Sequence, residues 1–150
     1  MNPAKHQSES QSDVLDPARA AAMQVALGQG ADITDGTPLP PFFHQLYFWA
    51  PQPPGKLGRD GHPAVGGGGL IPDMGLPRRM WAGGRLEFSK PLIAGQPARR
   101  ISVVEQAVHK QGRSGPLGFV TLRHEIRQDD TLGDTLGLRE WQDLVYREDP

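Results

Sequence analysis

Residues 108–126 read VHKQGRSGPLGFVTLRHEI, and the predicted fold follows from this stretch. From Leu117 to Arg127 apolar and polar residues alternate, which predicts a strand with one buried face. That face would carry Val120, Leu122, His124 and Ile126. The segment Gln111–Gly115 contains two glycines, Gly112 and Gly115, which are typical of a hairpin turn. It predicts a β-hairpin that joins this strand to the preceding one.

Further strands are predicted on both sides of this hairpin. Arg85–Ser89 and Ile101–Lys110 precede the turn, and Leu138–Arg147 follows a second turn region at Gln128–Gly137. One helix ahead of a meander of antiparallel strands is an α+β arrangement, in which the helix can cover one face of the sheet. The predicted fold class is therefore α+β.

The helix is predicted near the N-terminus, after a polar segment, residues 1–12, that is expected to be disordered. Asp16 is a good N-cap, and Pro17 suits the first helical position because its missing N–H is not needed there. Ala18–Leu27 is rich in alanine, and Gly28 can end the helix.

The middle of the chain is harder to interpret. Phe42–Ala50 is dense in aromatic residues and predicts either a buried strand or a short helix, because periodicity does not decide between them. Pro51–Pro77 is rich in glycine and proline and predicts a long loop. Pro77–Trp81 at its end is expected to form one helical turn.

The chain has 150 residues, a net charge of −1, no cysteine and five histidines. Its length predicts a single domain over residues 13–150. The near-neutral charge argues against binding to nucleic acid or to an anionic membrane, and the absence of cysteine excludes disulfides, thiolate metal sites and cysteine nucleophiles. The histidines are widely spaced, so no metal site is predicted. Without a recognisable signal peptide or an apolar run of about 20 residues, a cytoplasmic protein is expected.

Residues 72–113 hold eight Lys or Arg and three acids, a balance that suits a small anionic ligand. The residues predicted to contact substrate are Arg78, Arg79, Met80, Trp81, Lys110 and Arg113. Each pair also has a simpler explanation. One of the two arginines, Arg78 or Arg79, can pair with a carboxylate at an interface, and Met80 and Trp81 can pack on the core. Lys110 and Arg113, near the hairpin turn, can simply be solvated. His44 and His124 lie among apolar residues and are interpreted as hydrogen-bonded core or interface histidines.

Four segments together resemble a known family: LGRDGHP (57–63), PRRMWAGGRLEF (77–88), VHKQGRSGPLGFVTLRHEI (108–126) and EWQDLVYRE (140–148). They are similar to the N-terminal half of the MaoC-like acyl-CoA dehydratases, in the subgroup of mesaconyl-CoA hydratases and fungal-synthase-like dehydratases. The resemblance extends over residues 13–148. It implies a hot-dog fold, in which a curved antiparallel sheet wraps around a helix.

The resemblance also implies a function. Such proteins add water to, or remove it from, an enoyl double bond of an acyl-CoA thioester, with coenzyme A as part of the substrate and no separate cofactor. They combine two hot-dog halves, and the catalytic Asp and His lie in the C-terminal half in a run like GDxNPxH, which this chain lacks. We therefore expect no catalytic residue in this chain. It would supply the substrate pocket and a dimer surface, as a homodimer or as a heterodimer with a catalytic half. The alternatives are a non-catalytic structural or regulatory module and an acyl-CoA thioesterase.

Overall fold

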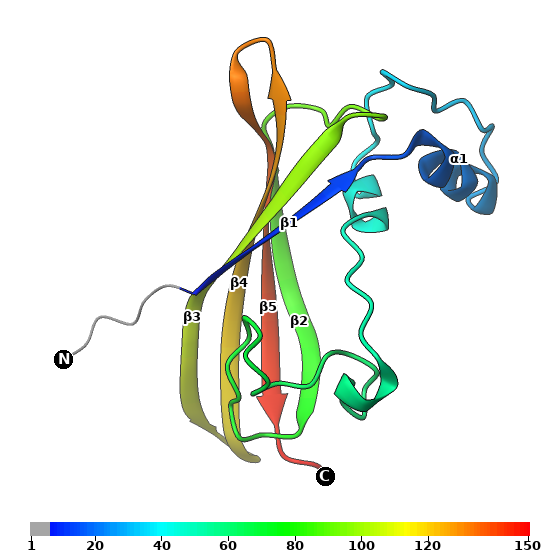
Figure 1. Ribbon diagram of the computed structural model, residues 1–150. Helices are drawn as coiled ribbons and strands as arrows, with labels where there is room; N and C mark the ends of the chain where they lie inside the picture. Colours follow the sequence, from blue (N-terminus) through cyan, green and yellow to red (C-terminus); the bar gives the residue numbers. More distant parts are fainter. Residues whose placement is uncertain (1–6) are drawn as a thin grey trace.

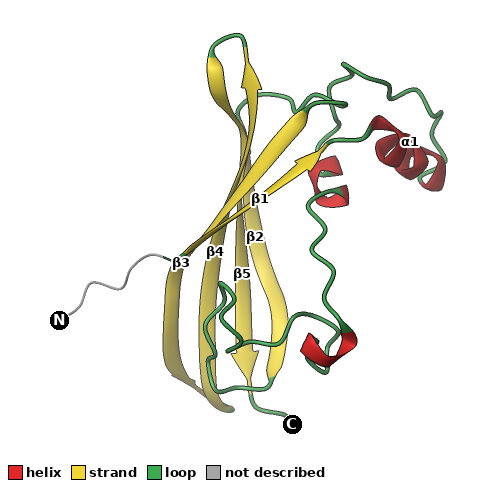
Figure 2. Ribbon diagram, in the orientation of Figure 1, coloured by secondary structure: helices red, strands yellow, loops and turns green. Residues whose placement is uncertain are grey.

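The computed structural model describes residues 7–150, which form an antiparallel sheet with one α-helix. The strands are β1 (Ser8–Val14), β2 (Arg78–Phe88), β3 (Pro97–Gly112), β4 (Gly115–Asp130) and β5 (Gly133–Arg147). Their spatial order is β1-β3-β4-β5-β2, and all neighbours are antiparallel. Figure 1 shows long, twisted strands with β1 crossing one edge, and Figure 2 shows how little of the chain is helical. The predicted α+β class is confirmed.

Helix α1 (Pro17–Ala26) begins and ends where the sequence predicts. The Asp16 carboxylate accepts a hydrogen bond from the Ala18 N–H at 2.9 Å, and Pro17 occupies the first turn. After the helix, Gly28 has a φ of 74°, a conformation that glycine adopts without strain. Ala20 is fully buried, so α1 joins the core at one end of the sheet (Figure 1).

The disorder predicted for residues 1–12 is wrong for residues 8–12, which belong to strand β1. β1 pairs with β3 from Ser8 opposite Val103 to Val14 opposite Pro97. An edge strand of this kind is held by backbone hydrogen bonds and needs few apolar side chains, which explains why composition did not reveal it. Residues 1–6 lie outside the described part of the chain.

The helical turn predicted at Pro77–Trp81 is also wrong, because β2 begins at Arg78 and runs to Phe88. It pairs with β5 from Arg78 opposite Arg147 to Phe88 opposite Leu138, with a bulge between Trp81 and Gly83. The ladder to β5 supplies the backbone partners that a single helical turn would have left unsatisfied.

The remaining elements differ less from the sequence prediction. The aromatic segment 42–50 contains the 3₁₀ helix η1 (Phe43–Leu46), and the long loop contains a second one, η2 (Pro54–Lys56). The β3–β4 hairpin turns between Gly112 and Gly115 as predicted. The second turn is shorter than predicted, because β4 continues to Asp130 and β5 begins at Gly133.

Two apolar clusters pack on one face of the sheet, which we call the inner face. It carries Val120, Leu122 and Ile126, which are 1–3% exposed, as the alternation predicts. The first cluster contains Leu15, Ala20, Ile33, Leu39, Phe43, Tyr47, Phe48, Leu92, Ala94, Ala98, Ile126 and Leu138. The second cluster contains Met74, Val120, Leu122, Leu144 and Tyr146. Each end of the inner face therefore has its own apolar covering.

The first cluster should dominate the stability of the helical end. We expect Leu15→Ala to lower the free energy of unfolding by about 2–5 kcal/mol, because Leu15 is fully buried between β1 and α1. Urea denaturation followed by circular dichroism measures the change. The matched control is Leu132→Ala at the β4–β5 turn, where the side chain is 84% exposed and the same truncation should change stability by less than about 0.5 kcal/mol. Equal effects of the two substitutions would contradict the assignment of this core.

Candidate functional site

A cavity of about 1080 Å³ lies between the inner face and the segment that connects η1 to β2. Its floor is formed by β3, β4 and β5, and its cover includes Tyr47, Phe48 and residues 67–71. In Figure 1 this covering segment runs from η1 past η2 and returns across the sheet. A concave space of this size, with apolar walls and a few polar groups, is typical of a small-molecule site.

The floor of the cavity is crossed by a row of polar side chains. Strand pairing places Ser102 on β3, His124 on β4 and Glu140 on β5 side by side. Gln142 lies two residues further along β5, on the same face as Glu140 and opposite Leu122. Polar groups on the buried face of a sheet are costly unless they are hydrogen-bonded, so their partners define the site.

Glu140 is bound by two side chains from η1. His44 Nε2 lies 2.8 Å from Glu140 Oε2, and Gln45 Nε2 donates to Glu140 Oε1 at 3.1 Å. Burial acts to raise the pKa of Glu140, but the hydrogen bonds and the positive potential of His44 outweigh it, and the pKa lies below its usual value. Glu140 is therefore an ionised acceptor, and His44 donates from Nε2. The other ring nitrogen, Nδ1, is buried with no partner among the described residues.

His124 is bound on both ring nitrogens. Its Nδ1 lies 2.7 Å from Ser102 Oγ, and its Nε2 lies 3.1 Å from Gln142 Oε1. Burial lowers the pKa of His124, and the charge of Arg100 lowers it further, against the opposing effect of Gln142. A neutral ring that donates from Nε2 to Gln142 must accept from the Ser102 hydroxyl at Nδ1.

Arg79 and Tyr146 are paired across β2 and β5 at the other end of the inner face. Arg79 Nη2 lies 3.1 Å from the Asp60 carboxylate, and its side chain is 13% exposed. The Tyr146 hydroxyl is buried without a hydrogen-bond partner among the described residues, and burial raises its pKa. Asp60 belongs to the segment 57–63, in which its carboxylate also accepts from the His62 backbone N–H at 3.1 Å.

Two of the predicted substrate-contacting residues reach the cavity. Arg79 and Trp81 both line it. Arg79 has the carboxylate partner that the sequence left open as an alternative, and Trp81 remains 58% exposed while its indole N–H donates to the Gly83 carbonyl at 2.8 Å. Their contact with substrate stays a prediction.

The other four predicted residues lie elsewhere. Arg78 and Met80 alternate with Arg79 and Trp81 along β2 and so occupy the outer face. Lys110 lies over the ring of Phe119 at 5.1 Å, on the outer face as well. Arg113 is exposed in the β3–β4 turn. The structure therefore does not bring the six residues together into one site.

The sequence did not predict that His44 and His124 line the same cavity. Both make the hydrogen bonds predicted for them, yet both line the cavity with Glu140 and Gln142. A signal was present, because Glu140 and Gln142 occupy the same alternating positions of β5 as the buried Leu138. Polar residues at apolar positions of a strand mark a site rather than a core.

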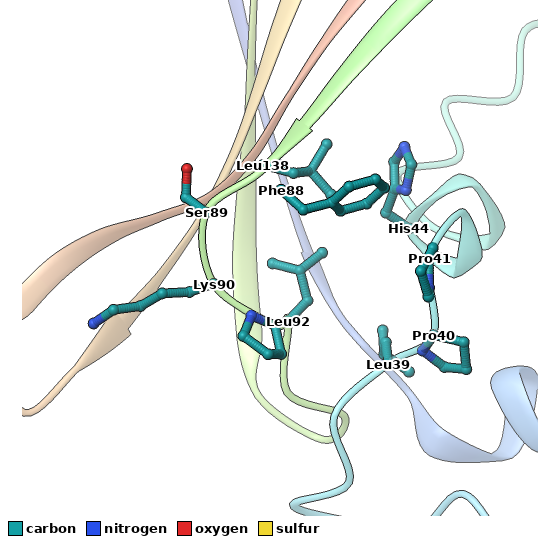
Figure 3. A pocket seen from close by; sticks show the side chains of 10 residues that line it. Leu39, Pro40, Pro41, His44, Phe88, Ser89, Lys90, Leu92 and Leu138 are labelled. Atoms are coloured by element: carbon teal, nitrogen blue, oxygen red, sulfur yellow. The ribbon is translucent and has the colours of Figure 1, made fainter.

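A second, smaller pocket of about 230 Å³ adjoins His44. Figure 3 shows apolar side chains from the segment before η1 facing Phe88, Leu92 and Leu138. His44 lines both this apolar pocket and the larger cavity.

Within residues 7–150, no group of three or more His, Asp or Glu side chains could hold a metal ion. In the same residues no helix is long and apolar enough to cross a membrane.

The sequence model of the hydroxyacyl-thioester dehydratase type 2 family matches residues 42–150. Mesaconyl-C(4)-CoA hydratase from Chloroflexus aurantiacus is 46% identical over 134 residues, which are 89% of this chain and 45% of that protein. The chain thus spans less than half the length of this relative.

Two solved structures from Mycobacterium tuberculosis share the fold. The ChsH1–ChsH2 complex has a TM-score of 0.62 at 14% identity, covering 93% of this chain and 88% of that chain. The HadBC (3R-hydroxyacyl-ACP dehydratase) complex has a TM-score of 0.57 at 15% identity, covering 96% and 98%. At such identities the likeness concerns the fold alone, and it confirms the predicted hot-dog fold.

The lowered pKa of Glu140 predicts a specific pH dependence of stability. We expect Glu140→Gln to lower the free energy of unfolding by about 1–3 kcal/mol at pH 7, because it removes charged hydrogen bonds to His44 and Gln45. A carboxyl group with a lowered native pKa stabilises the fold above its unfolded pKa of about 4.3 and loses that effect as the pH falls through the native value. The difference between wild type and variant should therefore shrink below about pH 4.

Urea unfolding at a series of pH values measures this difference. Glu87→Gln on the exposed part of β2 is the control, and its effect should be small throughout. A wild-type advantage that persists unchanged to acidic pH would contradict an ionised, hydrogen-bonded Glu140.

Proposed function

Because the chain belongs to the hydroxyacyl-thioester dehydratase type 2 family, we propose that it is one hot-dog half of a hydro-lyase acting on acyl-CoA thioesters. The observation that carries the proposal is the large cavity on the inner face, whose walls combine apolar side chains with the Ser102–His124–Glu140 row. The apolar walls suit an acyl chain, and the polar row suits its oxygen atoms.

In this proposal the catalytic Asp and His come from a partner half. Two observations support it: the chain covers 45% of the mesaconyl-C(4)-CoA hydratase that it resembles, and it contains no run like GDxNPxH. Both similar structures are complexes of two named components, which is consistent with assembly as a homodimer or heterodimer. The exposed edges of β1 and β2 leave backbone groups that such an association could use.

The proposed reaction is general acid–base addition of water. A base takes one proton from water, the oxygen bonds to the β-carbon of the enoyl thioester, and an acid delivers a proton to the α-carbon. The reverse sequence removes water from the 3-hydroxyacyl thioester. This chain would bind and orient the acyl group in its cavity, while the partner half moves the protons.

The proposal is tested by assaying the chain alone and assembled with a catalytic half that carries the GDxNPxH-like run. Loss of the enoyl-thioester absorbance of mesaconyl-CoA or crotonyl-CoA should be fast for the assembly and near background for the chain alone. Hydration by the chain alone would contradict the division between two halves and would assign the chemistry to this chain's own cavity, which both His44 and His124 line. Release of free thiol would favour a thioesterase.

The predicted contact of Arg79 with coenzyme A can be separated from its ion pair. We expect Arg79→Ala to weaken acyl-CoA binding by about 10- to 100-fold in calorimetric titration, because a guanidinium bond to a phosphate contributes on the order of 1.5–3 kcal/mol. Arg78→Ala, on the outer face of the same strand, is the matched control and should leave affinity unchanged. Asp60→Asn removes the ion-pair partner but keeps the cation. If it weakens binding as much as Arg79→Ala, Arg79 acts only by holding the loop.

A further inference from the structure

Ser102, His124 and Gln142 form a hydrogen-bonded relay that the proposed function uses only as a polar surface. Ser102 on β3 lies opposite His124 on β4, and its Oγ is 2.7 Å from His124 Nδ1. The second ring nitrogen, Nε2, lies 3.1 Å from Gln142 Oε1 on β5. All three side chains line the large cavity, so the relay begins at a hydroxyl that borders the space available to a ligand.

The direction of these hydrogen bonds is the one that activates a hydroxyl. An amide oxygen such as Gln142 Oε1 can only accept, so His124 Nε2 carries the proton and donates it. Nδ1 of the neutral ring is then an acceptor, and the Ser102 hydroxyl donates to it. A hydroxyl bound to a histidine that a third group orients is the arrangement of a nucleophile with its general base.

His124 is kept in the protonation state that a base requires. Burial lowers its pKa, and the charge of Arg100 lowers it further, so the ring is neutral at pH 7 and can take a proton. Glu140 lies opposite His124 on the neighbouring strand, and its negative charge acts on the ring in the opposite direction. That charge stabilises the imidazolium that forms when the Ser102 proton is taken.

Ser102 is sheltered from bulk water and lies near a cation. It is 6% exposed, and among the described residues its hydroxyl is bonded only to His124. Arg100 lies two residues earlier on the same face of β3 and also lines the cavity. Its Nη2 donates to Gln11 at 2.8 Å, which leaves most of the five N–H donors of the guanidinium available. Such donors stabilise the negative oxygen of a tetrahedral intermediate.

We propose that Ser102 is a nucleophile that takes the acyl group of an ester bound in the cavity, with His124 as its general base and Gln142 as the residue that orients His124. The apolar walls of the cavity, which include Leu122 and Leu144, suit an uncharged acyl chain. This acyl transfer does not rest on the proposed hydration, because it needs neither a double bond nor a partner half.

The reaction proceeds in two balanced stages. Ser102 Oγ bonds to the carbonyl carbon while its proton passes to His124 Nδ1, which gives a tetrahedral intermediate. The bond from this carbon to the leaving oxygen then breaks, and that oxygen takes the proton from His124 and departs as an alcohol. Water repeats the sequence on the acyl-serine, so that a carboxylic acid is released and the Ser102 hydroxyl is restored.

The test treats the full chain with p-nitrophenyl butyrate and follows the release of p-nitrophenolate. The wild type should give a rapid burst of about one equivalent per chain, which is the kinetic signature of a covalent intermediate. Mass spectrometry of the acid-quenched protein should show one added butyryl group, and peptide mapping should place it on Ser102. A hydroxyl that only satisfied His124 in the folded state would give no adduct.

Three substitutions separate the roles within the relay. Ser102→Ala should abolish both the burst and the adduct. His124→Asn should slow the burst by about 100-fold or more, since a general base contributes on the order of 10²–10⁴ in rate. Gln142→Leu should slow it by about 10- to 100-fold, because the imidazolium loses a hydrogen-bond acceptor.

Ser89→Ala is the matched control. Ser89 is exposed beside the smaller pocket, and within residues 7–150 its hydroxyl has no histidine partner. Removing this hydroxyl should leave the burst and the adduct unchanged. Thermal unfolding of each variant identifies any that fails to fold, and the mapping of the wild-type adduct does not depend on a variant.

The outcomes separate this inference from the proposed function. Absence of a burst in the wild type, or an adduct on a residue other than Ser102, overturns the nucleophile. A burst that His124→Asn leaves unchanged overturns the general base and with it the relay. Labelling of Ser102 without hydration of mesaconyl-CoA by the assembly supports this inference and contradicts the proposed function. Hydration without labelling does the reverse.

Discussion

The rest of the structure depends on keeping a polar row hydrogen-bonded in the middle of an otherwise apolar sheet face. Ser102, His124 and Glu140 are neighbours on three strands, and burying them without partners would cost several kcal/mol. Apolar packing cannot satisfy them, so the core divides into two clusters with the row between them. The partners come from within the row, from Gln142 beside it, and from η1, which brings His44 onto Glu140.

The same constraint accounts for the way the face is covered. A helix lying across the sheet would bury the row against apolar side chains, whereas here α1 joins only the first cluster. The glycine-rich segment to β2 covers the rest. It follows η1, and the Asp60–Arg79 ion pair ties its middle to β2. The cavity lies between this segment and the sheet. The loop 51–77, which stands out in the sequence by its glycine and proline content, thus covers the cavity.

Local sequence pattern predicted the parts of the molecule that local physics determines. The alternation of β4 is clear because one face packs on the core, and the cap of α1 is set by Asp16 and its neighbours. β1 was not predicted because its polar residues show no apolar alternation, and the strand is recognised only by its pairing with β3. The His44–Glu140 contact joins residues 96 positions apart, and no local pattern reports such a pair.

The face to which each arginine belongs shows the limit of the sequence most clearly. Arg78 and Arg79 are adjacent, and only the register of β2 against β5 decides that Arg79 faces the cavity. Arg99 and Arg100 repeat the situation on β3, where Arg99 pairs with Asp134 on the outer face and Arg100 lines the cavity and donates to Gln11. Under the proposed function the partner half moves the protons, so this chain does not need its inner face for proton transfer in that reaction. That face is then available to bind and orient the acyl group in the cavity.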